Sequence, residues 1–567
     1  MKSWRIYLVL LLVGLFWLGI FIRLFQIQIV KHNFYKVAAD SQSRLFEELT
    51  PQRGEIFIHD KDGVLSPLAT NRNLDTVFLV PKELNDLSGE QKINIAGQLA
   101  SLLELDKDNI LAKINKINDP YELLKKRVDD ETVKKIKDLH FPGIYFVLQG
   151  WRWYPQNNLA SHLVGFVGFQ DDRQIGLYGL EKFYEKKLVG EAGILSGKKD
   201  ALGRPVLLDM ENFDPAKNGS KLILTIDQNI QYLAEEKLKA VIEKWGAEGG
   251  SIIVADPKTG AIRAMASWPN YNPNEYFKEK NMDVFLNPVT QKLFEPGSIF
   301  KLVTMAAGVD IGKVTPETTY VDTGSLQIGG YKIANAAEKS YGLSSMTRVL
   351  EKSINTGAVF VGRAIGHEAF KKYVQAFGFD HTTGVDLNNE LAGNISNFNE
   401  NREINDATAS FGQGIAVTPL QVVMAISALA NDGKIMKPFL VEKNIQPDNT
   451  EIVTRPEVIY QPITAQTAHT LTKMLVSTVE NGYDKIKLKN YTIAGKTGTA
   501  QIPDVHGYSE ETIHSFVGYA PAYDPAFIIF IKMDKPKGIR FASDSLAPVF
   551  AEVAQFLFNY YEIPPDK

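Results

Sequence analysis

Residues 295–307 read Glu-Pro-Gly-Ser-Ile-Phe-Lys-Leu-Val-Thr-Met-Ala-Ala, a pattern that predicts the start of a buried helix. Pro296 and Gly297 mark the beginning of this helix, and the apolar run 302–307 continues it. Ser298 and Lys301 are three residues apart, so a helix places them on one face, one turn apart. If a low-dielectric pocket keeps the lysine neutral, its amine can act as the base for a serine nucleophile.

Two more short motifs follow this helix. Ser353-Ile354-Asn355 supplies a hydroxyl and an amide two residues apart. Residues 491–495 read as the approach of a strand to Lys496-Thr497-Gly498-Thr499. Such a strand can hold a cation, hydroxyls and backbone N–H groups beside a bound peptide, and its glycine admits close approach. A phosphate loop is rejected because it needs glycine at position 490, which is Asn.

The order of the three motifs carries more information than any one of them. Alone, each is more often structural than catalytic. In the order Ser-x-x-Lys, Ser-x-Asn, Lys-Thr-Gly they form the signature of penicillin-binding proteins and serine β-lactamases.

The surroundings of these motifs predict a fold with strands at both ends and helices between. Residues 222–227 read as a strand that runs into Asp227, the N-cap of a long helix. We predict strands at 250–256, 261–267, 516–519 and 526–533, and helices at 302–309, 358–365, 420–430 and 546–561. This order favours an antiparallel sheet sandwiched by helices.

The chain before residue 214 reads as a separate mixed α+β module without a catalytic pattern. Ser88-Gly89-Glu90-Gln91 is a capping box that opens a helix ending near Leu105. Two lysine- and aspartate-rich helices are predicted at 108–117 and 131–140, and strands at 143–148 and 163–169.

An uncharged apolar run, Ile6 to Ile22, lies near the N-terminus. Its seventeen residues reach the short end of a bilayer span. Lys2 and Arg5 precede it, so the positive-inside rule places the N-terminus in the cytoplasm and everything after about residue 30 outside. The alternative is a cleaved signal peptide, whose apolar core is usually about 7 to 15 residues.

Composition excludes several other classes. The 567 residues are 44% apolar and 23% charged, which suits a large globular core. The net charge of −4 offers no basic excess for nucleic acid. There is no cysteine, hence no disulfide, thiolate zinc site or thiol nucleophile, and the nine histidines show no metal-binding pattern. We therefore expect neither a cofactor nor a metal.

The chain resembles a class B penicillin-binding protein over nearly its whole length. The residues that match the family's other signatures are Arg53-Gly54, Asp60, Gly63, Ala69, Tyr154-Pro155, Gly165, Gly179-Leu180-Glu181, Leu202-Gly203-Arg204, Gly412-Gln413-Gly414 and Thr418-Pro419-Leu420-Gln421. The resemblance implies a tail and anchor at 1–30, an elongated α+β pedestal of the dimerisation type at 31–214, and a transpeptidase domain at 215–567.

The resemblance also implies the chemistry. Ser298 would attack the penultimate D-Ala of a peptidoglycan stem peptide, with Lys301 as general base. Ser353 would pass a proton to the leaving D-Ala, and Asn355 would position Lys301. Lys496 would keep the pocket positive for the substrate carboxylate. Thr497 and Thr499 would bind that carboxylate beside Gly498. The backbone N–H groups of Ser298 and Thr499 would form the oxyanion hole, and β-lactams would acylate Ser298.

Other functional interpretations of these motifs stay open. In a D,D-carboxypeptidase or β-lactamase, water replaces the acceptor amine, although a β-lactamase would not need the anchored pedestal. A β-lactam sensor or inactive scaffold is the non-enzymatic alternative, and the intact motifs argue against it. Within the family, Ser353-Ile354-Asn355-Thr356-Gly357 favours the division type over the elongation type. Either type implies a polytopic SEDS-family glycosyltransferase as its membrane partner.

Overall fold

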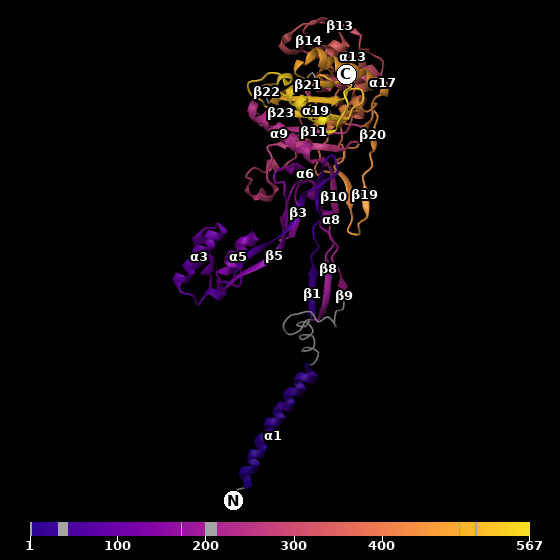
Figure 1. The fold of residues 1–567 in the computed structure, drawn as a ribbon. Helices are drawn as coiled ribbons and strands as arrows, with labels where there is room; N and C mark the ends of the chain where they lie inside the picture. Colours follow the sequence, from indigo (N-terminus) through magenta and orange to yellow (C-terminus); the bar gives the residue numbers. More distant parts are fainter. Residues whose placement is uncertain (1–2, 32–43, 172, 199–211, 487, 505–506) are drawn as a thin grey trace. The chain divides into compact units, whose positions relative to one another are not determined.

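The computed structural model describes residues 3–31, 44–171, 173–198, 212–486, 488–504 and 507–567. Two compact units divide the chain. Unit 1 consists of Met1–Gln52 and Val189–Gly219, and unit 2 of Arg53–Leu188 and Ser220–Lys567 (Figure 1). Leu202-Gly203-Arg204, one of the family signatures, lies outside the described residues.

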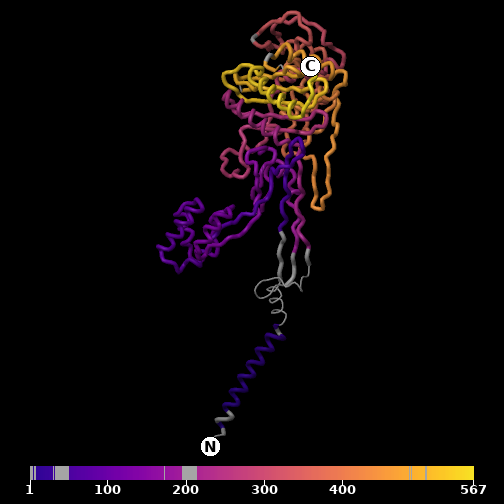
Figure 2. Tube along the Cα trace, in the orientation of Figure 1, coloured from indigo at the N-terminus to yellow at the C-terminus, as the bar shows by residue number. Residues whose placement is uncertain are grey.

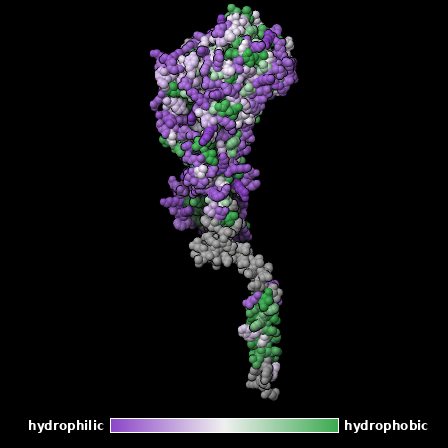
Figure 3. All heavy atoms as spheres, turned by 90° about the vertical axis from the view of Figure 1, so that its right-hand side faces the viewer, coloured by the Kyte–Doolittle hydropathy of each residue, from purple (hydrophilic) through white to green (hydrophobic). Residues whose placement is uncertain are grey.

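Unit 1 contains the predicted anchor. Helix α1 spans Ser3–Phe25 and continues as one π-helical turn, Gln26–Val30. Within the described part of the chain, Leu8–Ile29 is the one helical stretch long and apolar enough to cross a membrane. Its apolar side chains lie on the surface, seen as green spheres in Figure 3. The unit also holds an antiparallel sheet in the order β1-β8-β9, formed by Arg44–Leu49, Gly193–Lys198 and Asn212–Asp214.

A five-stranded antiparallel sheet forms the centre of the C-terminal part of unit 2. Its strand order is β12-β11-β23-β22-β21. The strands are β11 (Gly249–Ala255), β12 (Ile262–Trp268), β21 (Ala494–Asp504), β22 (Gly507–Ala520) and β23 (Phe527–Asp534). Strand β11 from early in the domain pairs directly with β23 near the C-terminus, so magenta and yellow segments run together in Figure 2.

Helices cover both faces of this sheet, as the sequence predicts. Because side chains alternate along a strand, Ile252 and Val254 face one layer and Ile253 faces the other. The first layer is made by α9 (Gln228–Trp245) and α19 (Ala547–Tyr560). The second contains α11 (Lys301–Asp310), α13 (Asn355–Ile365), α16 (Pro419–Ser427) and α17 (Ala465–Gly482).

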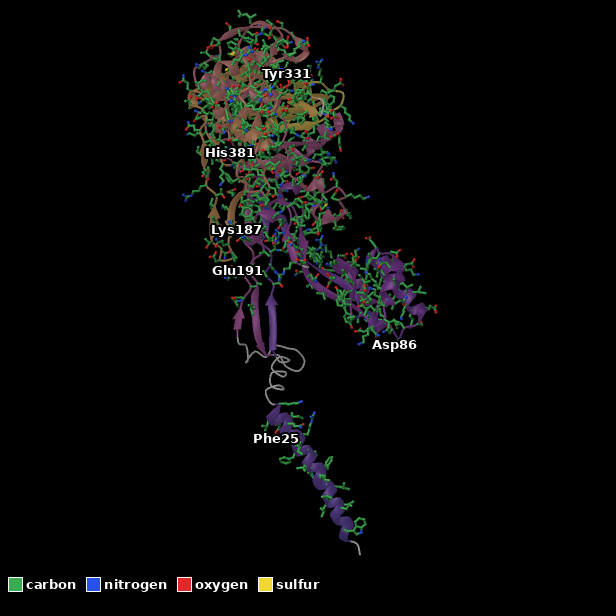
Figure 4. The ribbon with its side chains drawn as sticks, turned by 180° about the vertical axis from the view of Figure 1, so that it is seen from behind. Phe25, Asp86, Lys187, Glu191, Tyr331 and His381 are labelled. Carbon is green, nitrogen blue, oxygen red and sulfur yellow. The ribbon has the colours of Figure 1, made fainter. Side chains whose placement is uncertain are left out.

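Shorter elements complete this part of unit 2. The helices are α10 (Pro288–Gln291), α12 (Met346–Glu351), α14 (His367–Ala376), α15 (Glu403–Ala409) and α18 (Ala542–Ser545). The paired strands are β13 (Thr319–Asp322) with β16 (Gly342–Ser345), β14 (Ser325–Ile328) with β15 (Tyr331–Ala334), and β17 (Ile435–Met436) with β20 (Val458–Tyr460). Tyr331, labelled in Figure 4, is exposed at the start of β15.

A second sheet of seven strands draws on distant parts of the chain. Its order is β19-β18-β10-β2-β3-β4, with β5 paired to β3. The strands are β2 (Ile56–His59), β3 (Leu65–Leu79), β4 (Glu122–Val128), β5 (Ile144–Trp153), β10 (Lys221–Asp227), β18 (Val441–Ile445) and β19 (Glu451–Val453). Strand β10 runs parallel to β2 and ends at Asp227, whose carboxylate caps α9 as predicted.

The N-terminal part of unit 2 is mixed α+β, as expected. Helix α3 (Gly89–Leu103) begins with the predicted capping box at Ser88 and packs with α4 (Lys107–Ile114) and α5 (Asp130–Asp138). The single strand predicted at 163–169 is wrong in its first half. Residues Ser161–Val164 form the helical turn α6, and β6 spans Val167–Gln170. Gly165, at φ +72°, separates them and turns the chain. The part ends with β7 (Arg173–Gly176), α7 (Gly179–Phe183) and α8 (Glu185–Leu188).

Candidate active site

Ser298 lies on a 3-10 turn, Gly297–Phe300, that leads into α11. The predicted helix therefore begins with a tighter turn. Gly297 has φ +55°, and its N–H donates to the carbonyl oxygen of Gly412 at 3.0 Å. A Cβ on Gly412 would lie 2.2 Å from the Gly297 carbonyl oxygen, so only glycine allows this approach. The Ser298 side chain is half-buried, and its hydroxyl has no hydrogen-bond partner among the described residues.

Lys301 is almost completely buried one turn after Ser298, at 1% exposure. Its Nζ donates to the Ser353 carbonyl oxygen at 2.6 Å and to Asn355 Oδ1 at 2.7 Å, and lies 3.2 Å from Ser353 Oγ. Burial lowers the pKa of Lys301 well below its usual range, and the positive charge of Lys496 lowers it further. The structure therefore favours a neutral amine at this position.

Ser353 and Asn355 lie where α12 gives way to α13. Ser353 adopts φ +54°, a left-handed conformation that turns the chain between the two helices. Both its carbonyl and its hydroxyl reach Lys301. Asn355 opens α13, and its Nδ2 donates to the Ala334 carbonyl oxygen of β15 at 2.8 Å. Because a carbonyl can only accept, this bond fixes the amide so that Oδ1 faces Lys301.

Lys496 reaches the same serine from the edge strand β21 and is fully buried. Its Nζ donates to Ser353 Oγ at 3.0 Å and to the Thr497 carbonyl oxygen at 3.0 Å. Ser353 Oγ therefore bridges Lys301 and Lys496. The structure thus brings all three motifs together at one hydroxyl.

The strand around Gly498 packs against the turn that carries Ser298. A Cβ on Gly498 would lie 2.4 Å from Ser515 Oγ and 3.0 Å from the Pro296 carbonyl oxygen. Thr497 and Thr499, on either side, are half-buried. Thr499 Oγ1 accepts a hydrogen bond from the Ala542 N–H at 3.3 Å. Both threonines thus present hydroxyl groups near the surface beside the buried lysines.

Tyr483 is a member of this site that the sequence motifs do not contain. It follows the last turn of α17, and its Oη lies 3.3 Å from Lys496 Nζ and 2.9 Å from Thr497 Oγ1. The sequence gives no signal for it, because it stands thirteen residues before Lys496 and outside any motif.

His514 follows the Lys-Thr-Gly motif in the sequence, and the structure packs its side chain in the interior. It is fully buried on β22, opposite Thr499, and its Nδ1 bonds Ser545 Oγ at 2.8 Å. Burial lowers the pKa of His514 to about 4. The imidazole is therefore neutral near pH 7.

The family residues of the N-terminal part form a buried ionic network. Glu181 is fully buried, and it accepts hydrogen bonds from Arg53 Nε at 2.7 Å and from Arg152 Nε at 2.6 Å. Burial alone would raise the pKa of Glu181, but the two guanidinium groups outweigh it and lower that pKa. Glu185 also accepts from Arg53 Nη2, at 2.6 Å. The signature residues at 53 and 181 thus meet in one structural cluster.

Comparison with known proteins gives a family match for the N-terminal part of the chain and another for the C-terminal part. Residues 250–555 match the penicillin binding protein transpeptidase domain, and residues 48–224 match the penicillin-binding protein dimerisation domain. Stage V sporulation protein D of Bacillus subtilis is 31% identical, covering 99% of this chain and 86% of that protein. Peptidoglycan D,D-transpeptidase FtsI of Escherichia coli K12 is 30% identical, covering 100% of this chain and 93% of that protein.

Solved structures show the same fold. Penicillin binding protein 2X from Streptococcus thermophilus superimposes with a TM-score of 0.73 at 24% identity, covering 91% of this chain and 80% of that one. Penicillin binding protein 3 from Mycobacterium tuberculosis, complexed with aztreonam, gives a TM-score of 0.69 at 25% identity, covering 92% and 98%.

With this fold, and with Lys301 and Lys496 both within hydrogen-bond distance of the Ser353 hydroxyl, the chain belongs to the penicillin-binding proteins that carry a transpeptidase domain. These are serine acyltransferases. The dimerisation domain ahead of the transpeptidase domain, and the full-length similarity to FtsI and stage V sporulation protein D, identify the class B type.

Proposed function

We propose that this chain is a peptidoglycan D,D-transpeptidase that cross-links stem peptides through an acyl-enzyme on Ser298. The observation that carries the proposal is the environment of Lys301. A neutral amine has two N–H donors and one lone pair. Two acceptor-only oxygens, the Ser353 carbonyl and Asn355 Oδ1, take both N–H groups. The lone pair of Lys301 is then left to accept a proton.

Ser298 supplies the nucleophile in this proposal. Its hydroxyl is free of protein partners in the described structure, and Lys301 follows it by one turn. Lys301 takes the Ser298 proton as Oγ bonds to the carbonyl carbon of the penultimate D-Ala. The peptide bond to the last D-Ala then breaks, and its nitrogen leaves with a proton supplied through Ser353. The acyl group remains on Ser298 as an ester.

Ser353 is suited to this relay. Its Oγ lies within hydrogen-bond distance of Lys301 and Lys496, so the proton of its hydroxyl can pass between the amine and the leaving group. Asn355 holds the Lys301 amine in place through a bond that is itself fixed by Ala334. We assign Asn355 the positioning of Lys301 and of the substrate amide.

Lys496, Thr497 and Thr499 form the proposed carboxylate site. The buried Lys496 supplies positive charge, and the two half-buried threonines offer hydroxyls. Since Thr499 Oγ1 already accepts from Ala542, its own proton remains for a ligand. Gly498 lets the strand pack closely against the turn that carries Ser298. The N–H groups of Ser298 and Thr499 form the oxyanion hole in this proposal, a contribution typically worth roughly 3 to 4 kcal/mol.

The second half-reaction joins two stem peptides. An amine from a neighbouring peptide attacks the ester carbonyl and gives up a proton to the neutral Lys301, the bond to Ser298 Oγ breaks, and Lys301 returns that proton to the serine oxygen. A β-lactam resembles the D-Ala-D-Ala end and acylates Ser298 in the same way. Its acyl group stays attached because no acceptor amine reaches it.

Labelling with a fluorescent penicillin tests this function, with Ser298→Ala as the control. We expect covalent labelling of the wild-type chain that persists for many minutes and is lost in Ser298→Ala. Rapid loss of label with hydrolysis of the drug would replace the proposal by a β-lactamase. Absence of labelling in the folded protein would favour a scaffold. A donor–acceptor peptide assay separates transpeptidase from D,D-carboxypeptidase, since only the former forms the cross-linked product.

We further propose the membrane setting. The apolar helix Leu8–Ile29 anchors the chain in the cytoplasmic membrane, with the N-terminus inside and the catalytic domain outside. The motif Ser353-Ile354-Asn355-Thr356-Gly357 favours a role in division over one in elongation. A SEDS-family glycosyltransferase is the proposed partner of the anchor and the pedestal. Co-purification from solubilised membranes, with and without residues 1–30, tests that pairing; equal recovery of the partner would contradict a contact through the anchor.

The proposed domain boundaries are 1–30 for tail and anchor, 31–214 for the pedestal and 215–567 for the transpeptidase domain. The family matches at 48–224 and 250–555 support two successive domains. Limited proteolysis followed by mass spectrometry tests the boundary near residue 214.

A further inference from the structure

Tyr483 is held rigidly behind the Lys-Thr-Gly strand. It is 6% exposed, and its N–H closes the end of α17 by donating to the Val479 carbonyl oxygen at 3.1 Å. Its ring meets Phe516 of β22 edge-on, with centroids 6.1 Å apart. The direction of its hydroxyl is therefore set by the fold.

The hydroxyl of Tyr483 has three neighbours among the described residues. Its Oη lies 3.3 Å from Lys496 Nζ, 3.2 Å from the Thr497 N–H nitrogen and 2.9 Å from Thr497 Oγ1. An ammonium and a backbone N–H can only donate, so these two fill the acceptor positions of Oη. The remaining neighbour, Thr497 Oγ1, must accept the tyrosine's own proton.

This assignment determines what Thr497 can do. Its Oγ1 accepts from Tyr483, and no other described residue bonds it. The proton of the Thr497 hydroxyl is thus left to donate outward. Thr497 is half-buried, so this proton is available to a ligand. A ligand group that only accepts hydrogen bonds, such as a carboxylate, fits this arrangement best.

We propose that Tyr483 is a positioning residue that orients the Thr497 hydroxyl to donate to the substrate carboxylate. This inference rests on the proposed function, because it concerns the carboxylate of the D-Ala-D-Ala end and of β-lactams. Tyr483 acts through Thr497 and Lys496 and does not itself touch the substrate. Its loss frees the Thr497 hydroxyl to rotate and removes one partner of Lys496.

The experiment compares Tyr483→Phe with wild type, using a fluorescent penicillin that has a free ring carboxylate and the methyl ester of the same compound. The two probes differ at the group that Thr497 is proposed to bind. Losing one hydrogen bond to a charged group is worth about tenfold to a hundredfold in rate. We expect the second-order acylation rate with the acid to fall about tenfold and the rate with the ester to stay unchanged.

Tyr519→Phe is the matched control. Tyr519 is also buried in this domain, and its Oη also bonds a threonine, Thr472 Oγ1, at 2.8 Å. The Tyr519→Phe variant should leave both acylation rates and their ratio unchanged. Thermal unfolding of both variants checks that the fold is kept.

The outcomes separate this inference from the proposed function. An equal fall in both rates for Tyr483→Phe would overturn the inference, because it would indicate a general effect on the strand or on Lys496. Unchanged rates with both probes would overturn it as well. A wild-type chain that reacts with neither probe would instead contradict the proposed function.

Discussion

At the scale of single residues, the two buried lysines of the site differ in what surrounds them. Lys301 faces two carbonyl-type oxygens and the serine that it shares with Lys496. The charge of Lys496 has the same sign as a protonated Lys301, so burial and repulsion both lower the pKa of Lys301. That combination prepares a base, whereas a carboxylate beside Lys301 would have kept it protonated.

This leads to a prediction about pH. Lys301 acts as a base only when neutral, so the acylation rate should rise with pH and level off above its lowered pKa, well before the ordinary lysine value of 10.5. In Lys496→Gln the repulsion disappears, the pKa of Lys301 rises, and the rising limb should move to higher pH. The measurement is the acylation rate by penicillin from pH 6 to 10.

The maximum rate of Lys496→Gln will also be lower, because the charge that attracts the carboxylate is gone. The informative quantity is therefore the midpoint of the profile and not its height. Identical midpoints in the two proteins would show that Lys496 does not influence the protonation of Lys301.

Much of the site could be predicted from the sequence at this scale. Ser298, Lys301, Ser353, Asn355 and Lys496 stand in recognisable motifs, because each motif combines a required chemical group with a fixed local spacing. Tyr483 could not be predicted. Its place beside Lys496 depends on where α17 ends relative to β21, which is a matter of tertiary packing.

At the scale of elements, glycines set how closely the site's segments approach. The turn before Ser298 lies against Gly412 so tightly that a side chain there would overlap the Gly297 carbonyl. The same segment continues to Gly414, whose N–H donates to Glu295 Oε1 at 3.0 Å. The family signature at 412–414 therefore holds the loop that positions Ser298, the proposed nucleophile.

We predict that Gly412→Ala lowers stability by at least about 2 kcal/mol and reduces penicillin labelling, because the Cβ must displace the turn before Ser298. Gly312→Ala is the control. Gly312 also has positive φ, at +69°, but nothing lies within 4 Å of its would-be Cβ. Gly312→Ala should lower stability by only about 1 kcal/mol, the cost of backbone strain alone, and its penicillin labelling should be normal. Chemical denaturation and labelling measure both; equal losses would refute the steric explanation.

A second element-scale prediction concerns the ionic cluster in the N-terminal part. Glu181→Gln removes the buried charge between Arg53 and Arg152, leaving Arg152 without its counter-ion and Arg53 with Glu185 alone. We expect a loss of about 3 kcal/mol in the free energy of unfolding. Glu185→Gln changes the partly exposed partner of Arg53, and we expect it to lower the free energy of unfolding by less than about 1 kcal/mol. Similar denaturation midpoints for the two variants would contradict this ranking.

Element prediction succeeded where capping signals are strong and failed where backbone geometry interrupts a pattern. The capping box at Ser88 and the N-cap at Asp227 fixed two helix starts. The apolar run 163–169 looked uniform, yet Gly165 divides it into a helical turn and a strand. Strand β21 likewise starts at Ala494, three residues after the predicted approach begins.

At the scale of the whole molecule, the fold class followed from the order of predicted elements, but the partners of the strands did not. The five-stranded sheet and its two helical layers agree with expectation. The seven-stranded sheet unites β2 and β3 with β10, β18 and β19. Pairings over such separations leave no local trace in a single sequence, because alternation identifies a strand without identifying its neighbour.

The membrane orientation gives the whole-molecule prediction. The chain has no cysteine, so single cysteines can be introduced without background labelling. A membrane-impermeant maleimide added to intact cells with a permeable outer envelope should label Glu279→Cys, on an exposed loop, and not Trp4→Cys, at the N-terminal end of α1. Detergent should expose both. The reverse pattern would contradict a cytoplasmic N-terminus.

The strand order of the seven-stranded sheet also determines when the N-terminal part of unit 2 can finish folding. Strand β2 is synthesised early, yet β18 and β19, which close its sheet beyond β10, follow about 390 residues later. At about 5 to 20 residues per second, the ribosome needs about 20 to 80 seconds to supply them. Between the synthesis of β10 and that of β18, about 215 residues or about 10 to 40 seconds, the backbone edge of β10 has no partner from β18, and an open edge invites pairing with other chains. The N-terminal part therefore cannot complete its sheet before residue 453 has been made, and a fragment that stops before residue 441 would leave the ribosome with this sheet unfinished.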